Sequence, residues 1–348
     1  MTAAPSEGTR ERGGTVTAWH VFVVLIALAS LSPFVTAPVM AEFVPKNSSV
    51  LHLYAIVGFI GANFHVAASG WFYTDRQMWP HLSDHPLRYF IVPAVLIPAS
   101  AATFWLVDRH VAYWLVLPFL AWQIWHYQKQ NVGLLSFIAS GTDKVPLSPW
   151  ERRALLLAGV AGILGFFNVV RLPPENLHPL FATLHRIGMG VYLLTVAAAI
   201  VAFLFQPGLR RNPLRLAFFL LGVLFFAPTF LFSDVASAIG GYALAHGLQY
   251  LVFMGFICAH KVSARRAVII LLTLGIGGGF LLNIGSDAAA WTEGYGMALF
   301  GAFVGTVMSH FVLDAGVWRL REPFQRAYMR EHFNFLFQRP SQQGQQQS

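Results

Sequence analysis

Long apolar segments separated by short polar loops run through almost the whole chain. An α-helix rises about 1.5 Å per residue, so crossing the hydrocarbon core of a bilayer takes roughly 20 residues. The expected fold is therefore an all-α integral membrane bundle of about ten helices, with 16–316 as one transmembrane domain. We predict the individual transmembrane helices at 16–40, 50–73, 89–107, 111–139, 154–171, 180–206, 216–233, 236–260, 267–284 and 295–316.

Basic residues occur in alternate loops, and this pattern predicts an orientation. The loops at 41–48, 234–235 and 285–294 carry few or no Lys and Arg, whereas the loops between them carry several. Short cytoplasmic loops are enriched in Lys and Arg, so both termini are expected in the cytoplasm. The cytoplasmic segments would be 1–15 and 317–348, the second ending in a disordered Gln-rich tail. A multi-pass protein of the cell's inner (plasma) membrane is the expected location.

The composition agrees with a lipid-facing protein. Hydrophobic residues make up 56% of the chain and charged residues only 11%, whereas a soluble domain has roughly 25% charged residues. The net charge of +8 does not indicate nucleic acid, because the basic residues sit in short clusters between apolar segments. Cys258 is the only cysteine, which excludes an intrachain disulfide and a CxxC site.

Polar side chains are concentrated in the even-numbered predicted helices. A polar group in hydrocarbon is costly, so it usually faces the bundle interior and marks a functional site. At about 1.5 Å per residue, His65, His126 and His310 lie about 22 Å from the outer ends of their helices, and His246 about 15 Å. We expect the even-numbered helices to bring these four histidines together and the odd-numbered helices to insulate them.

Neutral imidazole is the commonest metal ligand in proteins, and its second nitrogen needs a partner. A lone buried histidine is more often a hydrogen-bonded packing residue, so the hypothesis depends on the set of four. Several histidines beside a carboxylate suit iron, copper or zinc better than magnesium or calcium, and iron is the cofactor we expect. The predicted ligands are His65, His126, His246 and His310, and the predicted supporting residues are Gln130, Asn131, Gln249 and Asp314.

The other polar residues of the apolar segments have more ordinary interpretations. His20, His185 and His260 lie near predicted helix ends, where an interfacial position is expected. His81 and His85 have the i, i+4 spacing of ligands but fall in a short loop before a proline. Lys129 is unusual, because a lysine in mid-helix is expensive. Either it pairs with an acid such as Asp314, or its helix ends closer to the cytoplasm.

Several common catalytic motifs are missing from the chain. There is no HH pair, which disfavours the membrane desaturases and alkane hydroxylases with HxxHH clusters. There is also no Walker A motif, GxSxG elbow, HExxH or CxxCH. Haem held between two histidines remains open, because it requires only two facing imidazoles.

Four short motifs contain the four histidines: NFHVAAS at 63–69, WHYQKQN at 125–131, AHGLQYL at 245–251 and SHFVLD at 309–314. These motifs resemble those of the Brp/Blh family of bacterial β-carotene dioxygenases and occur in the same order. Members of that family are polytopic membrane proteins that cleave a carotenoid to retinal with iron held by intramembrane histidines. The resemblance implies that His65, His126, His246 and His310 belong to a metal site.

The chain also departs from the pattern of that family. The first motif lacks its Asp, Tyr250 stands where an HxxxH motif has its second histidine, and Asp314 is one residue closer to its histidine. The resemblance covers only these short motifs. It therefore supports a membrane metallo-oxygenase more than a carotenoid substrate.

Three functions follow as hypotheses. The first is a non-haem metal-dependent oxidoreductase acting on a lipophilic substrate that enters from the bilayer. The second is a haem- or quinone-linked electron-transfer protein. The third is a non-enzymatic transporter, in which the histidines and Lys129 form a proton path.

Overall fold

The chain folds as an all-helical bundle in a computed structural model that describes residues 18–43, 59–142, 144–170, 178–205, 212–288 and 294–337. No strand occurs among these residues. Seven of the helices are long and apolar enough to cross a membrane, as predicted for a polytopic membrane protein. Their crossing segments are Ala18–Glu42, Leu87–Leu106, Pro149–Val169, His178–Phe205, Ala236–Lys261, Arg265–Asp287 and Tyr295–Val317.

The three other predicted spans differ from single apolar helices. Helix α6 (Arg109–Thr142) is longer than the predicted 111–139, but polar residues in its middle lower its hydropathy. The predicted span 216–233 is two pieces, α10 (Pro213–Leu224) and α11 (Ala227–Leu231). Pro228 lies in the first turn of α11, where its missing N–H costs no helix hydrogen bond.

The predicted span 50–73 is described from Phe59 onward, and its first residues lie outside the described part. It consists of a π-helix η1 (Phe59–Phe64), one turn of α-helix α3 (His65–Ala68) and a 3₁₀ turn η2 (Ser69–Tyr73). Two other π-helices are described: η3 (Leu87–Ile91), and η5 (Ala236–Gly240), which leads into α12 (Gly241–Lys261). π-Helical turns inside helices occur frequently at functional sites.

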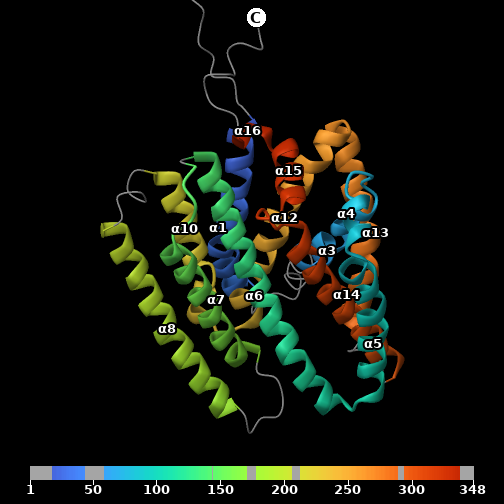
Figure 1. Cartoon of the computed structure of the whole chain (residues 1–348). Helices are drawn as coiled ribbons and strands as arrows, with labels where there is room; N and C mark the ends of the chain where they lie inside the picture. Colours follow the sequence, from blue (N-terminus) through green and yellow to red (C-terminus); the bar gives the residue numbers. More distant parts are fainter. Residues whose placement is uncertain are drawn as a thin grey trace, which may run out of the picture.

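The helices form two groups around a central pair (Figure 1). Helices α1 (Ala18–Phe43) and α12 pack along each other in the centre. Helices α7 (Pro149–Val170), α8 (His178–Phe205) and α10 lie on one side. Helices α5 (Val92–Leu106), α13 (Ala264–Ala288) and α14 (Tyr295–Val317) lie on the other. Helix α6 runs obliquely across the view and contacts α7, α12 and α14, so it connects the two groups.

Two short helices close one end of the bundle. Helices α15 (Pro323–His332) and α16 (Asn334–Phe337) lie at the end where α1 begins (Figure 1). Phe22 of α1 contacts the rings of Phe333 and Phe335. The first and last described helices therefore meet at the same end, while the side of the membrane on which this end lies stays a prediction.

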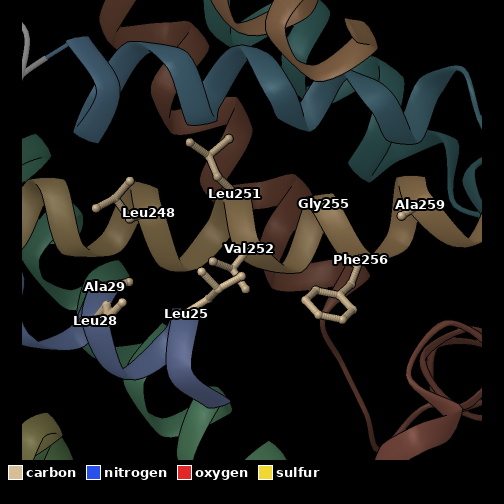
Figure 2. Close-up of a pocket in the computed structure, with 9 residues that line it drawn as sticks. All are labelled: Leu25, Leu28, Ala29, Leu248, Leu251, Val252, Gly255, Phe256 and Ala259. Carbon is tan, nitrogen blue, oxygen red and sulfur yellow. The ribbon is translucent and has the colours of Figure 1, made fainter. Parts of the chain in front are cut away.

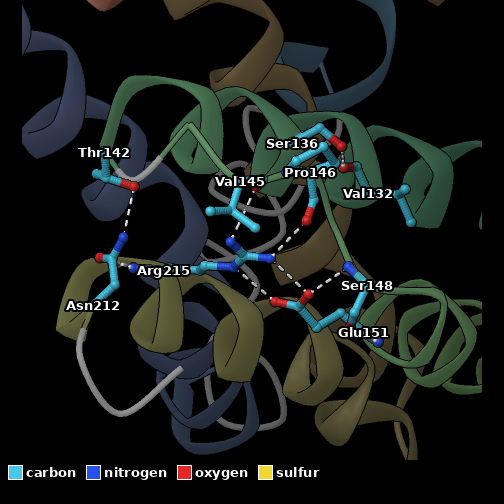
Figure 3. Close-up of polar contacts among 9 residues, drawn as sticks. All are labelled: Val132, Ser136, Thr142, Val145, Pro146, Ser148, Glu151, Asn212 and Arg215. Atoms are coloured by element: carbon cyan, nitrogen blue, oxygen red, sulfur yellow. Dashed lines mark hydrogen bonds and ion pairs between the residues drawn. The ribbon is translucent and has the colours of Figure 1, made fainter. Parts of the chain in front are cut away.

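At this end, a buried ion pair joins α7 to α10 (Figure 3). The Arg215 guanidinium donates to both carboxylate oxygens of Glu151 at 2.8 and 2.7 Å. It also donates to the backbone oxygens of Val145 and Pro146, both at 3.1 Å. Both side chains are almost fully buried. Arg215 lies in the first turn of α10 and is part of the protein interior, where it binds the loop between α6 and α7.

We predict that Arg215→Gln lowers the free energy of unfolding by about 3–5 kcal/mol, because it leaves the Glu151 carboxylate buried without its partner. Thermal unfolding of the detergent-solubilised protein measures the effect. Arg153→Gln is the matched control, since Arg153 lies on the same α7 helix with an exposed side chain. Equal unfolding temperatures for the two variants would contradict the prediction.

Two glycines allow η1 and α12 to touch through their backbones. A Cβ atom at Gly61 would lie 2.6 Å from the backbone nitrogen of Leu244. A Cβ atom at Gly247 would lie 2.7 Å from the backbone oxygen of Ile60. Backbone atoms cannot move aside as a flexible side chain can. Glycine at both positions is therefore required for this approach, and the approach places His65 next to α12.

We predict that Gly247→Ala separates η1 from α12 and destabilises the protein by about 1–3 kcal/mol, the usual range for overpacking. Gly255→Ala, two turns later on α12, is the control, because nothing lies within 4 Å of a Cβ atom there. That control should be neutral or slightly stabilising, since alanine favours a helix. Unfolding temperatures of the two variants check this, and a stable Gly247→Ala protein would refute the close approach.

Candidate metal centre

Four histidine rings from four separate elements meet inside the bundle. His65 begins α3 directly after the π-helix η1, and His126 lies in the middle of α6. His246 lies on α12, and His310 lies near the end of α14. These are the four histidines predicted as ligands from their depth in the helices. The sixth predicted helix, 180–206, corresponds to α8 and brings none of these histidines, because α8 lies at one side of the bundle and packs along α7.

The four rings form a closed circuit. Ring centroids are 4.6 Å apart for His65 and His246, and 5.0 Å apart for His246 and His126. They are 5.4 Å apart for His126 and His310, and 5.0 Å apart for His310 and His65. Neighbouring rings stand at 71–89° to each other. Four imidazoles bound about 2 Å from one ion would have neighbouring centroids about 4.5–5 Å apart, so the circuit has the size of a single metal site.

The ring nitrogens are short of partners. His65 Nε2 and His246 Nε2 face each other at 3.1 Å, close to the separation of two neighbouring ligands about 2 Å from one ion. Both nitrogens of His310, Nδ1 of His65 and of His246, and Nε2 of His126 are buried without a hydrogen bond. Buried polar atoms are normally hydrogen-bonded, and a group of exceptions points to a missing ion or ligand.

Asp314 adds a carboxylate to the circuit. Its Oδ2 lies 3.4 Å from His310 Nε2 and 3.6 Å from His126 Nε2. Its Oδ1 accepts a hydrogen bond from the Tyr250 hydroxyl at 3.3 Å. Potential ligand atoms fall into two overlapping groups, each within 4.8 Å: His65, His246 and His310, and then His126, His310 and Asp314.

Almost no solvent reaches this cluster. His65, His246 and His310 are exposed by 3% or less, and the His126 side chain by 11%. No Lys or Arg among the described residues forms an ion pair with Asp314. A buried carboxylate without a positive partner is very costly. A bound cation would neutralise it and would also use the free imidazole nitrogens.

The predicted supporting amides have a different role from the one expected. Gln130 donates to the backbone oxygen of His246 at 3.0 Å and to the side-chain oxygen of Gln249 at 2.8 Å. Gln249 donates to the Ser30 hydroxyl at 2.9 Å, and Asn131 donates to Gln128 at 3.1 Å. None of these bonds reaches an imidazole nitrogen. They connect α6, α12 and α1, and so hold together helices that carry the clustered histidines.

Aromatic residues beside the ligands complete the walls of the cluster. Phe311 stacks on His126 with centroids 4.4 Å apart, and the Tyr127 ring lies 4.3 Å from that of His246. The Tyr250 ring lies 5.5 Å from His65 and 5.4 Å from His310. Tyr127 and Phe311 were not predicted. Their only signal in the sequence is that each directly follows a ligand, which does not show that they contact it.

The remaining polar residues lie away from the cluster. Lys129 is exposed on α6 with its Nζ 5.8 Å from the Trp125 ring centroid, so it does not pair with Asp314. His185 contacts the backbone oxygen of Gly165 at 3.0 Å. His81 is buried, with its Nε2 2.9 Å from the Tyr89 hydroxyl and 2.8 Å from the side-chain nitrogen of Gln325. That contact binds α15 to the bundle end, and partial burial lowers the pKa of His81.

A separate apolar groove of about 540 Å³ lies between α1 and α12 (Figure 2). Leu25 and Leu28 of α1 and Leu251, Gly255 and Phe256 of α12 are among the residues that line it. None of the four histidines lines it, and neither does Asp314. The groove is therefore distinct from the histidine cluster.

Comparison with protein-family models, with curated proteins and with solved structures found no match. The geometry of the cluster is thus the main guide to function.

Proposed function

We propose that this protein is a membrane-embedded, metal-dependent oxidoreductase of the oxygenase type that acts on a lipophilic substrate. His65, His126, His246 and His310 would hold the metal, with Asp314 beside them. The single observation that carries the proposal is the closed circuit of four buried imidazoles, in which five of the eight ring nitrogens lack a hydrogen-bond partner.

Iron is the metal we propose. Four imidazole nitrogens and one carboxylate suit a first-row transition metal, and the described ligand atoms include no thiolate. When bound, such an ion would supply binding and activation of O₂ next to the substrate. The chain would hold the ion in place and exclude water from it. The low exposure of the three innermost histidines supports that role.

A lipophilic substrate fits the surroundings of the site. The cluster lies among apolar helices, and aromatic rings surround the imidazoles. His126 is the most exposed of the four histidines, and Trp122 is exposed one turn before it on α6. A substrate dissolved in the bilayer would therefore approach along α6, where Phe311 covers the His126 ring.

The alternatives receive less support from the same geometry. Two axial imidazole nitrogens, each about 2 Å from a haem iron, would lie about 4 Å apart with the porphyrin between them. His65 Nε2 and His246 Nε2 are only 3.1 Å apart, which is too close for a porphyrin between them. The rings of His126 and His310 complete the circuit. A His/Lys proton path is disfavoured because Lys129 faces away from the cluster.

We also propose ten membrane crossings, both termini in the cytoplasm and a plasma-membrane location. The alternation of basic loops supports this orientation. The meeting of α1, α15 and α16 at one end of the bundle supports an even number of crossings between them.

We predict that the purified protein contains close to one transition-metal ion per chain, and that His246→Ala removes most of it. Metal analysis of protein purified without chelator measures this, and a visible spectrum without a Soret band would argue against haem. His185→Ala is the control, because His185 is also partly buried in a membrane helix but lies outside the cluster. Metal-free protein with full activity would refute the proposed function.

A further inference from the structure

Tyr250 lies on α12, one turn after His246, at the wall of the metal centre. It is 2% exposed. Its ring is packed between those of His65 and His310, with centroids 5.5 and 5.4 Å away. Its hydroxyl is therefore directed within the cluster. A buried tyrosine normally finds a hydrogen-bond partner for this group, and the identity of the partner shows what the tyrosine does.

The partner is the Asp314 carboxylate, whose two oxygens make different contacts. Oδ1 accepts the Tyr250 hydrogen bond at 3.3 Å. Oδ2 faces His310 Nε2 at 3.4 Å and His126 Nε2 at 3.6 Å. One oxygen is thus held from α12, while the other faces two histidines from α14 and α6. Rotation of the carboxylate would break both arrangements at once.

We propose that Tyr250 is a positioning residue, which orients Asp314 so that Oδ2 faces His126 and His310. This inference rests on the proposed metal site. A carboxylate held in this way either binds the ion or fixes the orientation of the imidazoles that bind it. In both cases its orientation determines how strongly the ion is held, because outer hydrogen bonds tune metal ligands.

Tyr127 provides a matched control for this role. It is also buried, and its ring centroid lies 4.3 Å from that of His246. The Tyr250 ring is farther from its histidine neighbours, at 5.4 and 5.5 Å. Its hydroxyl, however, accepts a hydrogen bond from Gln123 at 2.6 Å on its own helix. Replacing either tyrosine with phenylalanine removes one buried hydroxyl beside the cluster. Only Tyr250→Phe removes a hydrogen bond to Asp314.

The test is titration of metal-free, detergent-solubilised protein with Co²⁺, which reports both affinity and coordination through its visible spectrum. We expect Tyr250→Phe to bind Co²⁺ about 10–100-fold more weakly than the wild type, the usual effect of removing an outer hydrogen bond. We also expect a changed spectrum. Tyr127→Phe should retain the wild-type affinity and spectrum. Unfolding temperatures of the metal-free proteins check that both variants are folded.

The double variant Tyr250→Phe/Asp314→Asn shows whether the tyrosine acts through the carboxylate. If it does, the double variant binds Co²⁺ no more weakly than Asp314→Asn alone. The inference is overturned if the two substitutions weaken Co²⁺ binding by factors that multiply in the double variant. It is also overturned if the Tyr250→Phe protein behaves like Tyr127→Phe. Wild-type protein that binds no Co²⁺ and contains no metal as purified would instead overturn the proposed function.

Discussion

A polar group inside a membrane must find its partner within the protein, because lipid offers none. This constraint accounts for most of the interior of the bundle. The Gln130 amide on α6 donates to the side-chain oxygen of Gln249 and to a backbone oxygen, both on α12. Arg215 and Glu151 satisfy each other and two loop carbonyls. The histidine cluster differs in degree, because five of its ring nitrogens are buried without a hydrogen bond. No other part of the described chain gathers so many such atoms in one place.

The backbone places the cluster as much as its side chains do. Gly61 and Gly247 bring η1 and α12 into direct contact, and two π-helical turns lead into the segments that carry His65 and His246. Each π turn shifts the register of the residues that follow it. The site therefore depends on irregular backbone whose geometry is held by close packing. The small residues Gly61 and Gly247 are therefore as important for the cluster as the histidines themselves.

Much of this arrangement could be predicted from the sequence, but not all. The depth of His65, His126, His246 and His310 follows from counting residues along helices, and their meeting follows from the cost of burial. Counting residues gives the depth of a side chain but not the rotation of α6 about its axis. Gln130 is therefore expected to contact an imidazole, whereas its amide donates to the backbone oxygen of His246. The break between α10 and α11 was missed because the apolar pattern continues across it. The sequence places Tyr250 one turn after His246, whereas its hydrogen-bond partner Asp314 comes from α14.

The order of the histidines along the chain bears on how the protein is made. His65 enters the membrane early in synthesis, whereas His310 belongs to the last apolar helix. Helix α6 must meanwhile find its place between the two helix groups. The four histidines can come together only after α14 has packed against the helices that precede it. Completion of the cluster and assembly of the bundle therefore depend on the same step.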